Sequence, residues 1–249
     1  MGNWFNLELS LLSTNSIQAI LFDLDGTLRH NRPNANDALF DYATLLGVED
    51  QPEKRLQAAR WSHYYWAQSP EMINDKQSFP DEDLFWINYC QHTLIAYGCM
   101  PVYARELAPE LFRFMRDEYE PVDWVPPDVP GTLENLQSAG LRLAMLSNRS
   151  KPYEEELEAL GLAGYFEFAM AAGEVDVWKP DPLVFRYALD QLGTQPGKTL
   201  YIGDNYYADV VGARRAGLFP ILVDPDGVFP EAECTVIQNV GDLCEMLNK

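Results

Sequence analysis

The chain has 249 residues, and 47% of them are hydrophobic, which is enough for a sizeable buried core and argues against global disorder. Its formal net charge is −20. Nucleic acids and anionic membranes are bound through concentrated Lys and Arg, so this charge argues against both as partners. An anionic substrate would therefore need a positive site that is local.

The four cysteines and the N-terminal segment point to a reducing compartment. None of the cysteines lies in a C-x-x-C spacing, and no histidines accompany them at zinc-like intervals, so free thiols are expected. No basic stretch precedes an apolar one near the N-terminus, and no apolar run approaches the ~18 residues of a membrane helix. We expect a cytoplasmic protein and assign no function to the first fifteen residues.

Short apolar runs that end in polar residues predict the strands of a sheet. These runs cover residues 17–22, 141–146, 199–202 and 221–223, with a weaker one at 166–170. Helical patterns lie between them and stop at glycines, over residues 131–139, 152–160, 182–192 and 207–216. Alternating strands and helices at this spacing predict parallel β-α-β units in a doubly wound sheet. Such sheets bind ligands beyond the carboxyl ends of their strands.

Residues 30–125 interrupt this alternation. The segment has no convincing buried strand and is helical in pattern and rich in aromatic residues. Trp61, Tyr64 and Tyr65 follow i, i+3, i+4 spacing, which predicts a ring stripe on one helix face, packed in a core. The prolines of residues 126–130 mark the return to the α/β pattern. We predict an inserted all-helical domain over 30–125 and a core domain made of 1–29 and 126–249.

Two carboxylates follow the first predicted strand. Asp23 and Asp25 are two residues apart and are succeeded by Gly26 and Thr27. Magnesium prefers oxygen ligands, and exposed amides of a turn can face phosphate oxygens, so the pattern suits a site for both. By itself, the same pattern is equally explained by a tight Asp-Gly turn.

Polar residues elsewhere along the chain favour a magnesium and phosphate site over a simple turn. Each has an ordinary explanation when taken alone, as a helix cap, a solvated surface cation or a residue of a first helical turn. They are Ser147-Asn148, Lys179-Pro180, Gly203-Asp204 and Asp209. Their common position near predicted strand ends, in this order, favours one shared site.

Four features of the chain resemble the four motifs of the haloacid dehalogenase superfamily: the stretch from Asp23 to Leu28, Ser147-Asn148, Lys179-Pro180, and Gly203-Asp204 through Asp209. The resemblance covers residues 17 to about 225 apart from the insertion. It implies a Rossmann-like parallel sheet core, and it implies that residues 30–125 are the helical cap that members of this subgroup carry after the first motif.

The resemblance also implies roles for the carboxylates. Asp23 would be the nucleophile that forms an aspartyl-phosphate, and Asp25 the general acid and then the general base. Mg²⁺ would be held by the side chains of Asp23 and Asp204 and the backbone carbonyl of Asp25. Asp209 would support the metal from a second sphere. A carboxylate nucleophile splits one difficult step into two easier ones.

The predicted phosphate-binding residues are Thr27, Ser147, Asn148 and Lys179. Magnesium and Lys179 would together neutralise the charge that a loose phosphoryl transition state spreads over its oxygens. This local positive charge reconciles an anionic substrate with the net charge of the chain.

The expected activity is hydrolysis of a small phosphorylated metabolite, and three alternatives stay open. A dehalogenase is disfavoured because, by the resemblance, such enzymes lack the second Asp of the first motif, and Asp25 is present here. A phosphomutase needs the same aspartyl-phosphate, and a silent binding protein could keep the fold without activity. Arg29 and Arg149 flank the motifs and are either surface cations or substrate contacts. Neither the substrate nor the oligomeric state can be read from the sequence.

Overall fold

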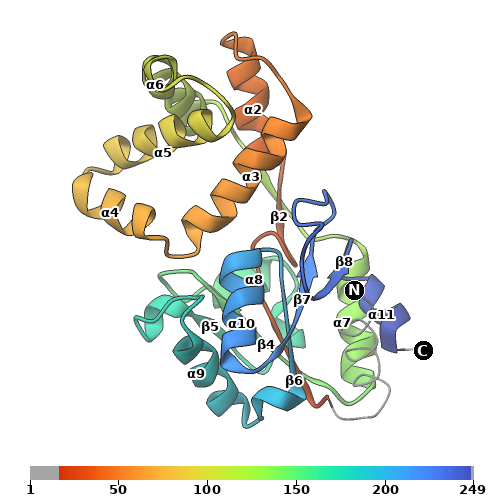
Figure 1. Ribbon diagram of the computed structural model, residues 1–249. Coiled ribbons are helices and arrows are strands. Elements are labelled where there is room, and N and C mark those ends of the chain that lie inside the picture. Colours follow the sequence, from red (N-terminus) through yellow and green to blue (C-terminus); the bar gives the residue numbers. More distant parts are fainter. Residues whose placement is uncertain (1–16, 248–249) are drawn as a thin grey trace. The chain divides into compact units, whose positions relative to one another are not determined.

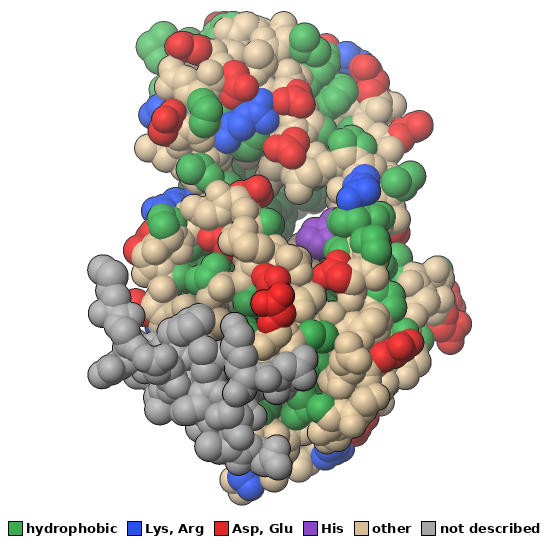
Figure 2. Space-filling view, turned by 90° about the vertical axis from the view of Figure 1, so that its right-hand side faces the viewer, with side chains coloured by type: hydrophobic (Ala, Val, Ile, Leu, Met, Phe, Trp, Pro, Cys, Tyr) green, Lys and Arg blue, Asp and Glu red, His purple; other side chains and the backbone are tan. Residues whose placement is uncertain are grey.

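The computed structural model describes residues 17–247 and divides the chain into two compact units (Figure 1). One unit consists of residues 31–123, and the other is formed by the segments on either side of it. Acidic side chains are scattered over the face shown in Figure 2 and do not gather into one patch there. Among residues 17–247, no helix has the length and apolar character needed to cross a membrane.

The flanking segments form a six-stranded sheet in the order β5-β4-β1-β6-β7-β8. All neighbouring strands in it are parallel. The strands are β1 (Ala19–Phe22), β4 (Arg142–Ser147), β5 (Ala169–Ala171), β6 (Thr199–Gly203), β7 (Phe219–Val223) and β8 (Thr235–Ile237). The predicted α/β, Rossmann-like fold is confirmed, and β8 is a short edge strand that the pattern did not predict.

Helices cover both faces of this sheet because the strands bury alternate side chains on each side. Ile20 and Phe22 of β1 share a core with apolar residues of α7 (Asp128–Ser138), α8 (Glu154–Ala159) and α11 (Asp242–Leu247). Ala19 and Leu21 point to the other face and share a core with α9 (Pro182–Leu192) and α10 (Gly212–Ala216). Short 3-10 turns occur at Ala163–Tyr165, Ala172–Glu174 and Pro196–Lys198.

The predicted helix ends are close to the observed ones, with one exception. The glycines expected to stop helices have positive φ, from 64° to 86°, as this role requires. They are Gly140, Gly161, Gly193 and Gly217. The expected helix over 207–216 is instead a π-helical turn, Tyr206–Val211 (η4), followed by α10. Such widened turns are frequent at functional sites.

The inserted unit contains a set of five helices between two short strands. The helices are α2 (Ala35–Leu45), α3 (Pro52–Trp66), α4 (Pro70–Ser78), α5 (Glu82–Ala96) and α6 (Pro101–Asp117). The strands β2 (His30–Arg32) and β3 (Val122–Trp124) pair with each other, so the insertion is not wholly helical. Three-residue strands are too short to give a period-two signal.

The aromatic stripe of α3 is only partly buried. Tyr65 has no exposed surface and packs with Tyr89, and Trp61 packs against the same cluster. Tyr64 is 41% exposed, so the expectation that all three rings lie in a core is wrong for this residue. The buried face of α3 carries Ala58, Ser62 and Tyr65, which are three or four residues apart, whereas position 64 lies about 100° around the helix from position 65 and outside that face.

Candidate active site

The carboxyl ends of three adjacent strands bring the predicted residues to one edge of the sheet. β1 lies between β4 and β6, with Phe22 in register with Met145 on one side and Ile202 on the other. Asp23, which follows β1, donates its backbone N–H to Ile202 O at 2.8 Å. The polar residues that end β4 and β6 therefore emerge beside Asp23, as expected for a parallel sheet.

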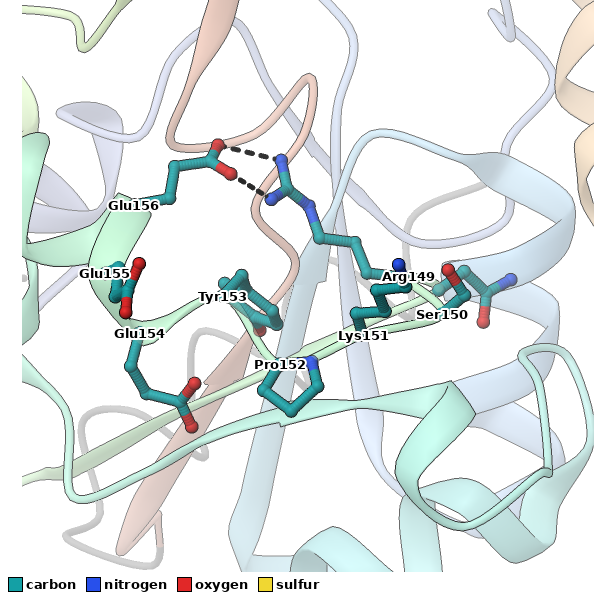
Figure 3. Close-up of a pocket in the computed structure, with 9 residues that line it drawn as sticks. Arg149, Ser150, Lys151, Pro152, Tyr153, Glu154, Glu155 and Glu156 are labelled. Carbon is teal, nitrogen blue, oxygen red and sulfur yellow. Dashed lines mark hydrogen bonds and ion pairs between the residues drawn. The ribbon is translucent and has the colours of Figure 1, made fainter.

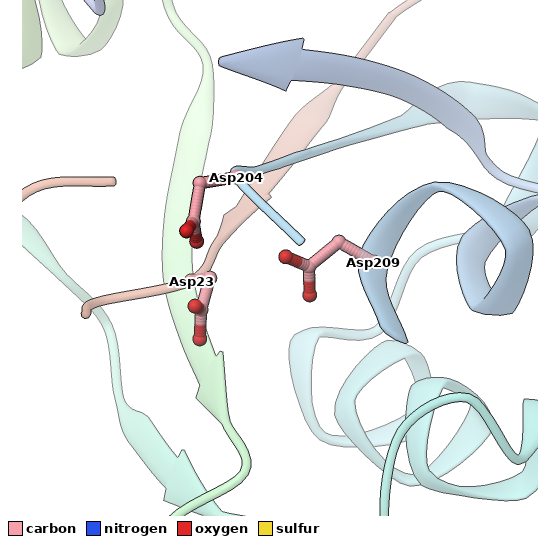
Figure 4. Close-up of side chains that lie close together, drawn as sticks. All are labelled: Asp23, Asp204 and Asp209. Atoms are coloured by element: carbon pink, nitrogen blue, oxygen red, sulfur yellow. The ribbon is translucent and has the colours of Figure 1, made fainter. Parts of the chain in front are cut away.

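Asp23, Asp204 and Asp209 form an acidic cluster at this edge (Figure 4). One oxygen from each lies within 4.8 Å of the others. Asp23 and Asp204 follow β1 and β6, while Asp209 comes from the π-helical turn and accepts the backbone N–H of Asn205 at 2.9 Å. Burial raises the pKa of Asp23 to about 7, and the carboxylates of Asp209 and Asp25 add to the rise while Lys179 opposes it. Burial and the neighbouring Asp209 and Asp23 carboxylates also raise the pKa of Asp204 well above its usual value.

Lys179 is the cation of this cluster. Its ammonium donates to Asp23 Oδ1 at 2.9 Å, to Asp209 Oδ1 at 2.7 Å and to Tyr201 Oη at 2.9 Å. The residue is only 2% exposed, so its interpretation as a solvated surface cation is wrong. Burial alone lowers the pKa of Lys179, but the Asp209 and Asp23 carboxylates raise it above its usual value. The ammonium is thus charged and has an acceptor for each of its three N–H groups.

Tyr201 is a site residue that sequence reasoning missed. It lies in the middle of β6, is fully buried and reads as an ordinary core residue. Its hydroxyl donates to Leu146 O at 2.8 Å and therefore presents a lone pair to Lys179. No local sequence pattern signals this contact.

Asn148 lies at the same edge, but its side chain faces the Lys179 backbone. Asn148 Nδ2 donates to Lys179 O at 2.9 Å, and Lys179 N donates to Asn148 Oδ1 at 2.7 Å. This side chain therefore holds the loop that carries the lysine. Ser147 is buried at the end of β4, and Thr27 Oγ1 donates to Asp204 Oδ1 at 3.4 Å.

Asp25 is held by two arginines. Arg149 donates to both of its carboxylate oxygens at 2.8 Å, and Arg29 donates to Oδ1 at 3.0 Å. Arg149 also contacts Glu156, a residue that the sequence patterns did not single out. Arg29 and Arg149 are thus ion-paired residues of the site and not isolated surface cations.

Two glycines are required by the close approach of these carboxylates. A Cβ on Gly26 would lie 2.3 Å from Asp204 Oδ2, and a Cβ on Gly203 would lie 2.3 Å from Asp209 Oδ2. Gly26 also has a φ of +83°, which side chains disfavour.

The acidic cluster fits a hard divalent cation. It offers three carboxylates and one ammonium, so two negative charges are unbalanced when all three carboxylates are ionised. Carboxylate oxygens are the ligands that such ions prefer. Both oxygens of Asp209 already accept hydrogen bonds, from Lys179 and from the Asn205 backbone. Asp23 and Asp204 are therefore the side chains best placed to hold a cation directly.

Comparisons with known proteins agree with this geometry. The chain is 33% identical to a phosphoserine phosphatase from Thermus thermophilus, covering 92% of this chain and 98% of that protein. It is 26% identical to (S)-2-haloacid dehalogenase 4A from Burkholderia cepacia, covering 93% and 94% of the two chains. The crystal structure of a 2-haloacid dehalogenase from Pseudomonas syringae covers 93% of this chain and 98% of its own, with 27% identity and a TM-score of 0.53. The family model for haloacid dehalogenase-like hydrolases matches residues 17–217, so this chain belongs to the haloacid dehalogenase-like hydrolase family.

Proposed function

We propose that this protein is a magnesium-dependent phosphatase that hydrolyses a small phosphate monoester through an aspartyl-phosphate on Asp23. The observation that carries the proposal is the buried Lys179, which lies between Asp23 and Asp209 with Asp204 close by. A phosphatase is favoured over a dehalogenase because the site also contains Asp25, a proton donor that a poor alkoxide leaving group needs. The phosphatase relative covers nearly the whole chain and supports the same choice.

In this mechanism Asp23 attacks phosphorus while the bond from phosphorus to the ester oxygen breaks. Asp25 gives its proton to the departing oxygen, and an acyl phosphate remains on Asp23. Asp25 then takes a proton from water as that water attacks the same phosphorus, which releases phosphate and restores the Asp23 carboxylate. Lys179, 2.9 Å from Asp23 Oδ1, supplies a fixed positive charge beside the nucleophile throughout.

The residues that would hold magnesium are Asp23 and Asp204 through their side chains and Asp25 through its backbone carbonyl. Asp209 would act indirectly, because it fixes Lys179 and the Asn205 backbone. When bound, magnesium would neutralise the charge of the transferring phosphoryl group. Thr27, Ser147 and the Asn148 backbone are the proposed polar contacts to that group.

The physiological substrate is proposed to be a phosphorylated metabolite, and the location the cytoplasm. The first follows from a net charge of −20 that is unsuited to nucleic acid or anionic membranes. The second follows from the four free cysteines, which suit a reducing compartment.

The nucleophile is tested by a rapid-quench experiment with radiolabelled phosphate ester, followed by mass spectrometry of the peptide that holds residues 17–29. Wild-type protein and Asp25→Asn should carry label on Asp23, and it should accumulate in Asp25→Asn because its breakdown lacks a base. Asp23→Asn should carry none. Label on Asp25, or strong turnover by Asp23→Asn, would overturn the assignment.

The metal and the reaction class are tested together. Hydrolysis of p-nitrophenyl phosphate should require Mg²⁺, and Ca²⁺ should inhibit it because its larger, irregular coordination shell misplaces nucleophile and phosphate. Full turnover in excess chelator would contradict the metal requirement. Chloride release from 2-chloropropionate without hydrolysis of phosphate esters would identify a dehalogenase instead.

A further inference from the structure

Asp25 belongs to a ring of four charged side chains in which the charges alternate. Arg149 donates from Nε to Asp25 Oδ2 and from Nη2 to Oδ1, both at 2.8 Å. Its other edge faces Glu156, whose two oxygens accept from Nη1 and Nη2 (Figure 3). Arg29 closes the ring, with Nη1 3.0 Å from Asp25 Oδ1 and Nε 3.9 Å from Glu156 Oε1. The mechanism above uses only Asp25 of these four residues.

The position of Arg149 is fixed by its own segment of the chain. Glu156 lies seven residues further on, in α8, and the guanidinium lies 5.1 Å from the centre of the Tyr153 ring, just before that helix. These residues line one cavity of about 820 Å³ formed by residues 148–156. The hydrogen bonds that Arg149 donates to Asp25 and Glu156 raise its pKa above the usual value, so its charge is constant. Asp25, by contrast, is 124 residues away in sequence.

Asp25 needs such a partner because its side chain is 40% exposed on the turn after β1. An exposed aspartate samples several rotamers, whereas a proton donor must lie within hydrogen-bond reach of the departing oxygen. The fork of Arg149 fixes both oxygens at once, which a single donor cannot do.

The ring also distinguishes the two oxygens of Asp25. Within residues 17–247, Oδ1 accepts two hydrogen bonds, from Arg149 and Arg29, while Oδ2 accepts one, from Arg149. A carboxylate oxygen has two lone pairs, so Oδ2 keeps one for a proton. We propose that Arg149, supported by Glu156, is a positioning residue that presents Oδ2 of Asp25 to the leaving group. The proposal rests on the phosphatase function proposed above.

The test compares substrates whose leaving groups differ in their need for a proton. The value of kcat/KM reports steps up to formation of the aspartyl-phosphate, so it isolates the role of Asp25 as acid. For Arg149→Met we expect kcat/KM to fall on the order of 10-fold or more with glycerol 2-phosphate, a fraction of the roughly 10²–10⁴ that general acids supply. The fall should be smaller with phenyl phosphate and smallest, within about threefold, with p-nitrophenyl phosphate, whose leaving group departs unprotonated.

Three further variants separate geometry from charge and from folding. Arg149→Lys keeps the charge but cannot form a fork, so it should resemble Arg149→Met. Glu156→Gln keeps Arg149 but weakens the contact that supports it. Its kcat/KM with glycerol 2-phosphate should therefore fall relative to that with p-nitrophenyl phosphate, but by less than in Arg149→Met. Glu156→Gln carries the comparison if Arg149→Met does not fold. Arg142→Met is the matched control, because Arg142 forms a similar fork with Glu167 at the opposite end of β4, at 2.7 and 2.6 Å.

The outcomes are distinguishable. An equal loss with all three substrates, no loss with any, or full restoration by Arg149→Lys would overturn the positioning role of Arg149. A ratio shift of the same size in Arg142→Met would also overturn it, because the effect would then be general destabilisation. Wild-type protein that hydrolyses none of the three substrates in Mg²⁺ would instead count against the phosphatase function itself.

Discussion

Replacing Gly26 with alanine should lower the activity of the protein far more than its stability. The substitution has a backbone cost, because φ is +83°, and a steric cost, because the new Cβ would lie 2.3 Å from Asp204 Oδ2. The backbone cost is about 1–2 kcal/mol for an L-residue in this region. Removing the overlap requires the Asp204 carboxylate to shift by roughly 1 Å, and a misplacement of that size can cost about 10²-fold in rate.

Gly140→Ala is the matched control for this experiment. Gly140 has a φ of +84°, and nothing lies within 4 Å of the Cβ that it would gain. Both variants should therefore lose a similar free energy of unfolding through the backbone, measured by urea denaturation. Only Gly26→Ala should lose activity towards p-nitrophenyl phosphate and need more Mg²⁺ for half-maximal rate. Equal kcat/KM in the two variants would refute the inference that the position of Asp204 limits the reaction.

Three other predictions follow from buried groups. Lys179→Met should lower kcat on the order of 10²–10³-fold and destabilise the protein by about 3–5 kcal/mol, because it leaves Asp23 and Asp209 facing each other without a cation. Values of kcat within threefold of wild type would contradict this, and Lys151→Met, at an exposed lysine, is the control. Tyr201→Phe removes an acceptor from Lys179, so urea denaturation should show a loss of roughly 1.5–3 kcal/mol, and an unchanged midpoint would argue against the contact. Burial raises the pKa of the Cys90 thiol to about 12, so at pH 8 a thiol reagent should modify Cys90 only as the protein unfolds; rapid modification of the native protein would disagree with the structure.

The sequence predicts which residues reach the site better than it predicts the hydrogen bonds that their side chains make there. Asp23 and Asp204 could be placed because apolar runs mark buried strands, and parallel strands deliver the residues after them to one edge. The hydrogen bonds between Asn148 and Lys179 join residues 31 apart, and no periodic pattern reports on such a pair. Asn148 was accordingly predicted from its motif as a phosphate ligand, whereas its side chain in the structure holds the lysine loop.

The missed features have a common physical reason. Hydrophobic patterns record whether a position is buried, but not which polar atom a buried side chain reaches. Tyr201 therefore looks like any core residue of β6, although its hydroxyl accepts from Lys179. Glu156 looks like one of several acidic residues at the start of α8, although it is the one that contacts Arg149. The hydrogen bonds of the π-helical turn that presents Asp209 span one residue more than those of an α-helix, a difference too small to show in a ten-residue pattern.

The charges around the site sharpen the case for a cation. Each of the three basic side chains described here is already paired: Lys179 with Asp23 and Asp209, and both arginines with Asp25 and Glu156. These groups together carry four carboxylates, and Asp204 adds a fifth, against three positive charges. A phosphate dianion entering such a site would meet a net negative field that Lys179 alone does not reverse. We therefore infer that a divalent cation is needed for phosphate to bind as well as for it to react, because it supplies the positive charge that these residues lack.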